Sequence, residues 1–150
     1  MARAAVVTGA ASGIGRAVAA RLERDGAQVL AVDLEPDPDG PGEPFAADLT
    51  TREGNRDAVA AALERFGRLD TVIPNAGFQH VAPVEEFPED RWEAMIALLL
   101  TSPFLLARAA WPALRESGDA RFVAIASVHG LVASGTAPRS LRRMFAELED

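Results

Sequence analysis

Three glycines with the spacing G-x-x-x-G-x-G directly follow a short apolar run near the start of the chain. The segment is Thr8-Gly-Ala-Ala-Ser-Gly-Ile-Gly15, and a helical pattern begins within it. Glycine permits a tight turn there and lets a phosphate approach the backbone closely. The first turn of a helix adds unpaired N–H groups and the positive end of the helix dipole. The sequence therefore predicts a pyrophosphate-binding loop formed by Gly9, Ser12, Gly13, Ile14 and Gly15.

An acidic residue lies at the distance from this loop that a dinucleotide site requires. A glycine triplet alone marks an ordinary turn more often than a nucleotide site, but Asp33 ends the next apolar run, close to ~20 residues further on. Its carboxylate could accept hydrogen bonds from both hydroxyls of an adenosine ribose and would repel a 2′-phosphate. We therefore expect NAD to be preferred over NADP. A solvated loop carboxylate is the alternative interpretation of Asp33, and Arg16 is expected to be solvated.

The elements that must position these residues alternate regularly between strand and helix. Strands are predicted at 4–8, 29–32, 45–47, 71–74 and 122–125, and helices at 14–24, 50–66 and 90–114. The segment 36–44 is rich in Pro, Gly and Asp and is expected to be a loop, while Pro103 and Pro112 should interrupt or kink the last helix. This alternation predicts an α/β, doubly wound parallel sheet of the Rossmann-like type, with five strands in the order 3-2-1-4-5.

Two further motifs agree with the glycine loop in order and position. Asp48-Leu49 follows the third predicted strand, and Asn75-Ala-Gly77 follows the fourth. Together with the glycine spacing, they resemble the short-chain dehydrogenase/reductase family. In that family the first motif lies beside the adenine, and the second supports the sheet and lines the cofactor cleft. The resemblance thus adds Asp48, Leu49, Asn75, Ala76 and Gly77 to the expected cofactor-binding residues.

Two longer segments are similar to the 3-hydroxybutyrate dehydrogenases within this family. They are residues 77–88, GFQHVAPVEEFP, and residues 126–134, ASVHGLVAS. The resemblance implies that Ser127 is the catalytic serine, and that Gln79 and His129 help to bind the carboxylate of a small hydroxy acid. An amide and an imidazole can both donate hydrogen bonds to a carboxylate.

The chain departs from the family pattern at the positions that carry proton transfer. It contains no tyrosine and no lysine, and the positions of the family's acid–base pair hold Ser140 and Met144. The family's substrate-binding lysine corresponds to Ala137, and its asparagine in the fourth helix corresponds to Leu99. An aliphatic hydroxyl is far less acidic than a phenol, and methionine has no charge to lower a pKa. We therefore expect a catalytically impaired family member.

Two other functions remain open at this point. One is an active NAD-dependent oxidoreductase of 3-hydroxybutyrate or a related hydroxy acid. The other is a non-catalytic interaction module that uses the helix face at 95–106. Nucleotide binding would distinguish the impaired family member from the interaction module, and turnover would distinguish the active oxidoreductase from both.

The likeness ends near residue 134, which divides the chain into an NAD-binding domain at 1–134 and a divergent tail at 135–150. Apolar residues of the tail recur at i, i+3, i+4 and i+7, which predicts a helix. They are Leu141, Met144, Phe145 and Leu148. The early loss of likeness favours a truncated or frameshifted form whose sheet is incomplete at its C-terminal edge. Because an open strand edge invites pairing with another chain, we expect self-association.

Composition limits the remaining function classes. The net charge is −7, which argues against nucleic acid or an anionic membrane surface as a partner. The longest apolar run, 95–100, is too short to cross a bilayer. There is no cysteine, and two histidines, His80 and His129, do not make a metal site. A cytoplasmic protein is expected, because no signal peptide is visible.

Overall fold

The computed structural model describes residues 2–127 of the 150-residue chain. Five strands form its central sheet, and they are β1 (Ala4–Thr8), β2 (Gln28–Asp33), β3 (Glu43–Ala46), β4 (Thr71–Ile73) and β5 (Arg121–Phe122). The helices are α1 (Gly13–Arg24), α2 (Arg52–Phe66), α3 (Glu89–Ile96) and α4 (Ser102–Ser117), with a 3-10 turn, η1 (Val84–Glu86), and a π-helical turn, η2 (Ala97–Thr101). The predicted helix in the tail lies outside the described residues.

The sheet is parallel throughout, and its order is β3-β2-β1-β4-β5, as the sequence predicted. The register places Val6 opposite both Leu30 and Val72, so three buried strands cross the centre of the molecule side by side. Parallel strands all end at the same edge of the sheet. The loops that follow β1, β2, β3 and β4 are therefore gathered at one edge.

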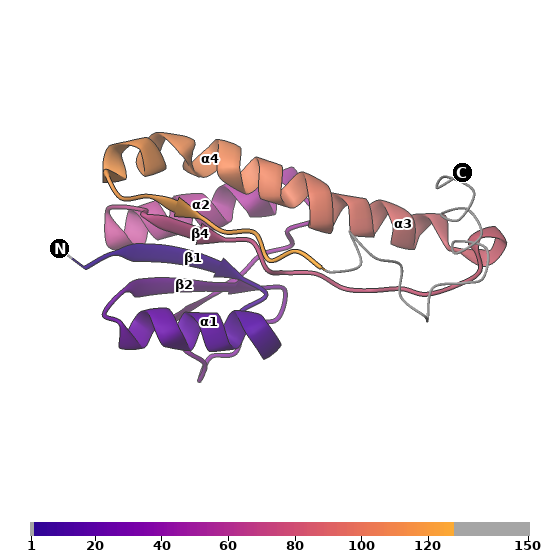
Figure 1. The fold of residues 1–150 in the computed structure, drawn as a ribbon, viewed down its shortest axis with the longest axis horizontal. Coiled ribbons are helices and arrows are strands. Elements are labelled where there is room, and N and C mark those ends of the chain that lie inside the picture. The colour runs from indigo at the N-terminus through magenta and orange to yellow at the C-terminus, as the bar shows by residue number, and fades with distance from the viewer. Residues whose placement is uncertain (1, 128–150) are drawn as a thin grey trace, which may run out of the picture.

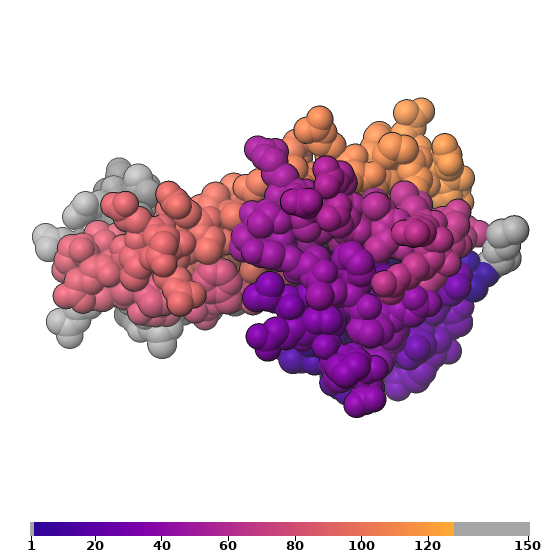
Figure 2. Space-filling view, turned by 180° about the vertical axis from the view of Figure 1, so that it is seen from behind, coloured from indigo at the N-terminus to yellow at the C-terminus, as the bar shows by residue number. Residues whose placement is uncertain are grey.

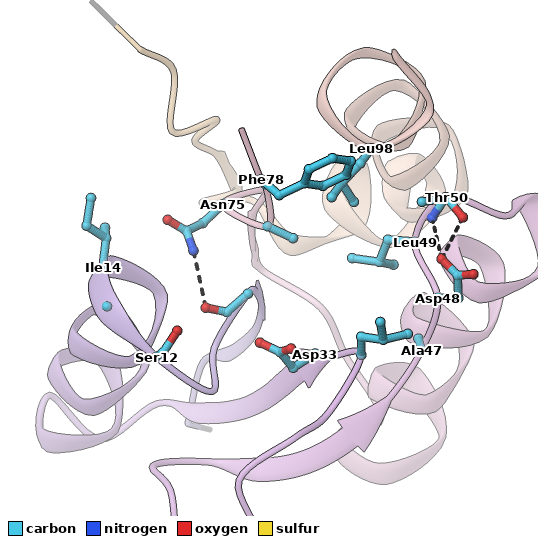
Figure 3. Close-up of a pocket in the computed structure, with 15 residues that line it drawn as sticks. Ser12, Ile14, Asp33, Ala47, Asp48, Leu49, Thr50, Asn75, Phe78 and Leu98 are labelled. Carbon is cyan, nitrogen blue, oxygen red and sulfur yellow. Dashed lines mark hydrogen bonds between the residues drawn. The ribbon is translucent and has the colours of Figure 1, made fainter. Parts of the chain in front are cut away.

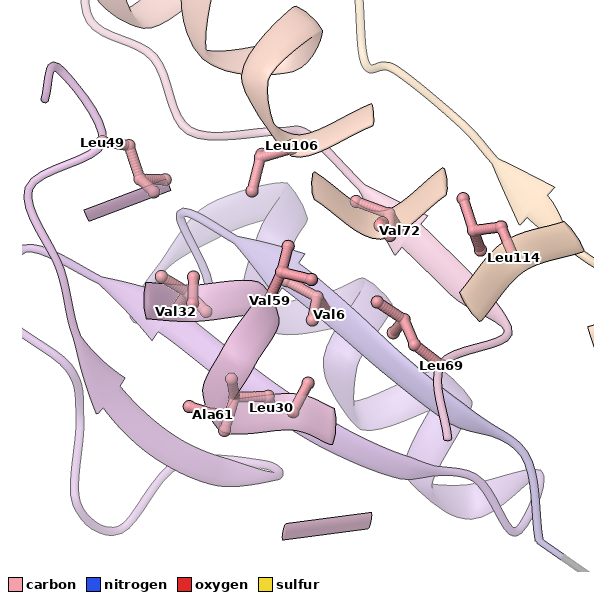
Figure 4. Packing of buried hydrophobic residues seen from close by; sticks show 13 residues of the cluster. Val6, Leu30, Val32, Leu49, Val59, Ala61, Leu69, Val72, Leu106 and Leu114 are labelled. Atoms are coloured by element: carbon pink, nitrogen blue, oxygen red, sulfur yellow. The ribbon is translucent and has the colours of Figure 1, made fainter. Parts of the chain in front are cut away.

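Helices cover both faces of the sheet (Figure 1). Helix α1 lies on one face, and α2 and α4 lie side by side on the other. Side chains of β1 alternate between these two layers, with Val6 in the α2–α4 layer and Val7 in the α1 layer. Leu106 and Leu114 of α4 complete the larger core cluster (Figure 4). Because helices cover both faces, side chains that point to either face are buried, and these strands are therefore almost continuously apolar.

The two outer strands differ from their predicted bounds. The segment 36–44 was expected to be a loop, but β3 already begins at Glu43 and includes Pro44. Proline is tolerated because, within the described sheet, β3 is an edge strand that pairs with β2, so one side of its backbone needs no partner there. Strand β5 is shorter than predicted, although the N–H groups of Val123 and Ile125 still donate to the carbonyls of Val72 and Pro74.

The long helical pattern is continuous from Glu89 to Ser117 but changes its winding in the middle. Pro103 has no N–H and cannot donate to the Leu99 carbonyl, and the turn just before it is π-helical, with the Ser102 N–H bonded to the Ala97 carbonyl. Pro112, by contrast, lies inside α4 without ending it. The segment around α3 extends past the body of the sheet (Figures 1 and 2).

The helical segment Glu89–Ser117 is long and apolar enough to cross a membrane, by length and composition only. This is weak evidence, because core helices meet the same criterion. Leu106, Ala110 and Leu114 are buried against the sheet, whereas 17% of the apolar window as a whole is buried.

Candidate functional site

A pocket of about 450 Å³ lies at the carboxyl edge of the sheet (Figure 3). Its lining comes from the four loops that follow β1, β2, β3 and β4, and from the π-helical turn. Gly15 is the one of the eleven predicted cofactor-binding residues that does not line it. The ten that do are Gly9, Ser12, Gly13, Ile14, Asp33, Asp48, Leu49, Asn75, Ala76 and Gly77. In an open parallel sheet such a crevice is where ligands bind.

The glycines of the first loop are required for two different reasons. A Cβ on Gly15 would lie 2.1 Å from the Gly9 carbonyl oxygen, and a Cβ on Gly9 would lie 2.8 Å from the Ala76 Cα. Neither distance is possible, so the loop could not pack against Asn75 and Ala76 with larger residues. Gly13 instead has open space around it but a φ of +53°, which side chains rarely adopt.

A hydrogen-bonded interlock holds the loop after β1 against the loop after β4. The Thr8 hydroxyl accepts from the N–H groups of Asn75 and Ala76, at 2.9 and 3.0 Å. The Asn75 side-chain amide donates to the carbonyls of Thr8 and Gly9, at 3.0 and 3.3 Å. Asn75 therefore joins the two loops where it lines the pocket.

The Asp33 carboxylate lies beside the glycine loop. Its Oδ2 accepts a hydrogen bond from the Ala11 N–H at 3.0 Å, and its Oδ1 accepts from the Glu35 N–H at 3.4 Å. These contacts orient the carboxylate at the end of β2, where it also lines the pocket. Negative charge is thus fixed where an adenosine ribose would lie in a dinucleotide site of this type.

Arg16 is not simply solvated, as the sequence had suggested. Its guanidinium forms an ion pair with Asp37 and donates to the Ala11 carbonyl at 3.5 Å. The pKa of the Asp37 carboxyl is lowered by the hydrogen bond from the Asp39 N–H and then by that from Arg16. A cation near the ribose end of the pocket is therefore already paired with a carboxylate.

Asp48 organises the loop after β3. Its Oδ1 accepts from the Thr50 N–H at 2.9 Å and from the Thr50 hydroxyl at 2.6 Å (Figure 3). The Thr51 hydroxyl donates to the Asp48 carbonyl and accepts from the Gly54 N–H, which caps α2. This local network leaves Leu49 facing the pocket and part of the core.

The N-terminus of α1 suits a phosphate group. Ser12 occupies the N-cap position without a side-chain hydrogen bond, and no acidic residue lies in the first turn. The first bond of the helix is the one from the Arg16 N–H to the Ser12 carbonyl, so the N–H groups of Gly13, Ile14 and Gly15 precede the helical ladder. Anions bind well at such an end. With the open space at Gly13, these donors fit the pyrophosphate of a dinucleotide.

The residues expected to bind substrate are placed less completely. Gln79 is exposed and is not part of the pocket lining, while His80 packs edge-on against Phe87 with ring centroids 5.2 Å apart. Ser127 is exposed and makes an interaction with another part of the protein. It lies shortly after Ile125, whose N–H donates to the Pro74 carbonyl. His129, Ala137, Ser140 and Met144 lie outside the described residues.

Several residues of the pocket were not predicted from the sequence. The further lining residues are Leu34, Ala47, Thr50, Phe78 and Leu98. Most are neighbours of predicted residues and could have been found by extending each motif by one position. Leu98 could not, because it reaches the pocket from the π-helical turn. No cluster of three or more His, Cys, Asp or Glu side chains that could hold a metal occurs within residues 2–127.

Comparison with known proteins gives this architecture a family. The profile of the short chain dehydrogenase family matches residues 3–138. The chain therefore belongs to the short-chain dehydrogenase/reductase family of oxidoreductases, whose members bind a nicotinamide dinucleotide, as the motifs around the pocket had indicated.

Among curated relatives, the chain is 38% identical over 144 residues to the D-beta-hydroxybutyrate dehydrogenase of Cupriavidus necator, covering 88% of this chain and 55% of the relative. It is 37% identical over 147 residues to the enzyme of the same name from Rhizobium meliloti, covering 89% and 57%. It is 39% identical over 141 residues to the uncharacterized oxidoreductase YxjF of Bacillus subtilis, covering 85% and 54%. The chain thus spans about half the length of the curated relatives it matches.

Solved structures agree on the fold. A short-chain dehydrogenase from Streptomyces avermitilis superposes with a TM-score of 0.81 at 32% identity, over 93% of this chain and 53% of that one. The aldohexose dehydrogenase of Thermoplasma acidophilum superposes with a TM-score of 0.86 at 22% identity, over 99% and 58%, which supports the fold alone.

Proposed function

We propose that the pocket binds NAD in preference to NADP, and that the chain as it stands is a catalytically impaired relative of the 3-hydroxybutyrate dehydrogenases. The observation that carries the cofactor proposal is the Asp33 carboxylate, held 3.0 Å from the Ala11 N–H beside the phosphate loop. In this proposal the donors at the start of α1 hold the pyrophosphate, Asp33 holds the ribose hydroxyls, and Asp48 and Leu49 border the adenine. The bound dinucleotide supplies hydride transfer.

The cofactor preference follows from charge. A 2′-phosphate would lie against the Asp33 carboxylate, and like charges in contact at a site cost several kcal/mol. Arg16 offers little compensation, because its guanidinium is engaged by Asp37. The same carboxylate accepts hydrogen bonds from the free ribose hydroxyls of NAD.

The test is calorimetric titration with NAD and NADP of the wild-type chain, Asp33→Asn and Asp33→Ala. The asparagine variant keeps an oxygen that can accept from Ala11 and removes only the charge. We expect the ratio of NADP to NAD affinity to rise about tenfold or more in both variants, as the loss of a like-charge contact requires. Asp39→Asn removes a charge from the neighbouring loop and should leave the ratio unchanged. Equal affinities for the two cofactors in the wild type would contradict the proposal.

The impairment follows from the residue types present. General acid–base catalysis contributes a factor of ~10²–10⁴ in rate, and no phenol or ammonium side chain exists anywhere in the chain to supply it. Ser127 can still orient a substrate oxygen, and Gln79 and His129 are the proposed carboxylate-binding residues. Without the tyrosine and lysine, the proton of the hydroxyl group lacks the acid–base pair that accepts it in the family.

Turnover tests this second part separately. Reduction of NAD by 3-hydroxybutyrate should be undetectable with the purified chain, even at NAD concentrations that saturate the pocket. A turnover number on the order of 1–10³ per second would overturn the proposal and require another proton acceptor. Ser140→Tyr combined with Met144→Lys should raise the rate above that of either single variant.

We also propose that the protein acts in the cytoplasm, where NAD is available.

A further inference from the structure

Two buried polar side chains, Asn55 of α2 and Ser102 of α4, are hydrogen-bonded to each other beneath the pocket. The Ser102 hydroxyl donates to Asn55 Oδ1 at 2.6 Å, although the residues are 47 positions apart in the chain. Asn55 is 0% exposed and Ser102 is 2% exposed. A buried pair of this kind is costly to break, because the remaining partner is left without a hydrogen bond.

On one side, the pair holds the loop after β3. The Asn55 side-chain amide donates to the Leu49 carbonyl at 2.8 Å and to the Thr51 carbonyl at 2.6 Å. Both donors and the acceptor of this amide are therefore in use. Leu49 lines the pocket directly, so its backbone position is fixed from below by Asn55.

On the other side, the pair holds the π-helical turn. The Ser102 N–H is bonded to the Ala97 carbonyl across that turn, and its hydroxyl is bonded to Asn55. Leu98 lies within the turn and lines the same pocket as Leu49. Ser102 thus fixes the segment that presents Leu98.

The remaining hydrogen bonds of the loop are local. Asp48 is bonded to Thr50 and Thr51, and Thr51 to Gly54. Among the hydrogen bonds of residues 2–127, the one between Asn55 and Ser102 is the link between the loop at 48–51 and the helical segment at 97–102. Apolar packing is the other connection, since Leu49 belongs to the larger core cluster and Leu98 packs against that cluster.

We propose that Asn55 and Ser102 are positioning residues for the adenine end of the cofactor pocket, and that their hydrogen bond sets the spacing between the walls formed by Leu49 and Leu98. The inference rests on the proposed binding of a nicotinamide dinucleotide. Neither side chain lines the pocket, so both act through the backbone segments that they hold. The pocket should therefore lose affinity for the adenine half of the cofactor when the bond is broken.

The variant that breaks the bond with least disturbance is Ser102→Ala, which removes one oxygen atom. We expect its affinity for ADP and NAD to fall about three- to tenfold, the range that one buried hydrogen bond is worth. Affinity for nicotinamide mononucleotide should change less than twofold. Ser102→Cys keeps a weak donor of similar size, so its affinity for ADP should lie between those of the wild type and Ser102→Ala.

Ser117→Ala is the matched control. Ser117 lies at the other end of α4 and donates to the Asp70 carboxylate at 2.6 Å, away from the pocket. It loses a hydrogen bond of the same length from the same helix. We expect a similar loss of thermal stability but unchanged affinity for ADP. If both variants weaken ADP binding in proportion to their loss of stability, the pair has only a structural role and the proposal is wrong.

Hydrogen exchange provides a readout that does not depend on the nucleotide. In Ser102→Ala the amides of residues 50–55 and 98–102 should exchange at least severalfold faster, while Ser117→Ala should leave them unchanged. Failure of the wild-type chain to bind ADP would contradict the proposed function, yet the exchange pattern would still decide whether the pair holds the two walls. Unchanged ADP affinity and unchanged exchange in Ser102→Ala would overturn the inference.

Discussion

The glycines of the phosphate loop are required for different physical reasons. Gly15 is required by crowding, since a Cβ there would lie 2.1 Å from the Gly9 carbonyl oxygen. Gly13 is required by its backbone, with a φ of +53° and no neighbour within 4 Å of a Cβ. The sequence spacing predicted that all three glycines belong to one loop. It could not distinguish these causes, because the crowding at Gly15 depends on how the loop folds back on the Gly9 carbonyl and on Asn75, which is far along the chain.

Alanine substitutions should separate the two causes. Gly15→Ala should lower the free energy of unfolding by about 3 kcal/mol, the upper part of the range for overpacking, since backbone must move. Gly13→Ala should cost about 1 kcal/mol, the penalty for a side chain at positive φ. Urea denaturation of the two variants beside the wild type measures both losses. Equal losses would mean that the crowding at Gly15 is relieved by a small shift of the loop.

Asp70 is the most strongly perturbed carboxyl group of the described residues. It is buried at the start of β4, where it forms two hydrogen bonds with the Arg68 guanidinium at 2.7 and 2.8 Å. It also accepts from the Ala4 N–H at 2.8 Å and from the Ser117 hydroxyl. Arg68 first, then Ser117 and Ala4, lower the pKa of Asp70 to about 2, against the effect of burial.

This network makes stability depend on pH in a specific window. The pKa of Asp70 is lower in the folded chain than its ordinary value of 3.8, so the contribution is complete above about pH 5 and is lost as the pH falls toward 2. We expect the wild type to lose about 2 kcal/mol more than Asp70→Asn over this window. Denaturation at several pH values measures the difference. Parallel curves for the two proteins would contradict the assignment.

At the scale of elements, α2 ends at Phe66 as predicted and begins at Arg52, slightly later than the predicted start at 50. Thr51 caps its start by accepting from the Gly54 N–H at 3.0 Å, and Gly67 ends it with a φ of +70°. The Gly67 N–H donates to the Leu63 carbonyl, which completes the last turn. Local signals of this kind are encoded within a few residues, so a helix boundary can be predicted from them.

Gly67 therefore offers a test of backbone strain without crowding, since no atom lies within 4 Å of a Cβ placed there. Gly67→Ala should cost about 1 kcal/mol of unfolding free energy. Gly67→Asn should cost less, because asparagine adopts this conformation more readily than alanine. Thermal denaturation of the pair gives the comparison. An asparagine variant less stable than the alanine variant would contradict the strain argument.

Other elements depended on contacts between distant parts of the chain. The start of β3 at Glu43 was missed, because the composition of 36–44 indicates a loop and only pairing with β2 makes its end a strand. The π-helical turn was anticipated only as an interruption by Pro103. The bond between Asn55 and Ser102 joins residues 47 positions apart, and neither residue belongs to a recognisable motif.

For the whole molecule, the strand–helix alternation and the family motifs together predicted the order of the sheet and the edge at which the pocket lies. The motif residues gather there because parallel strands share a carboxyl edge, which is a consequence of topology. The exposed face of η2 and α4 was less predictable from the sequence. Leu100, Phe104 and Trp111 have the spacing i, i+4 and i+11, and they are 68%, 60% and 60% exposed on η2 and α4.

These three side chains lie on one face of the helix, away from the buried Leu106 and Leu114. Large apolar side chains gathered on one exposed face are typical of an interaction surface. Strand β5 lies at the edge of the described sheet and adds further exposed apolar residues at Phe122, Val123 and Ile125. We therefore predict that the chain self-associates through α4 and the neighbouring edge of the sheet.

Sedimentation velocity at tens of micromolar should give a mass above the 15.9 kDa of one chain. Phe104→Asp combined with Trp111→Asp places two charges on the apolar face and should shift the protein toward the monomer. The helix should remain folded, because neither side chain is part of the core. Val84→Asp adds a charge at a residue that is 64% exposed on η1, and it should leave the association unchanged. Association through apolar surface should persist at high salt, whereas association through ion pairs would weaken. A wild-type chain that sediments as a monomer at every concentration would show that this face has no partner in a second copy.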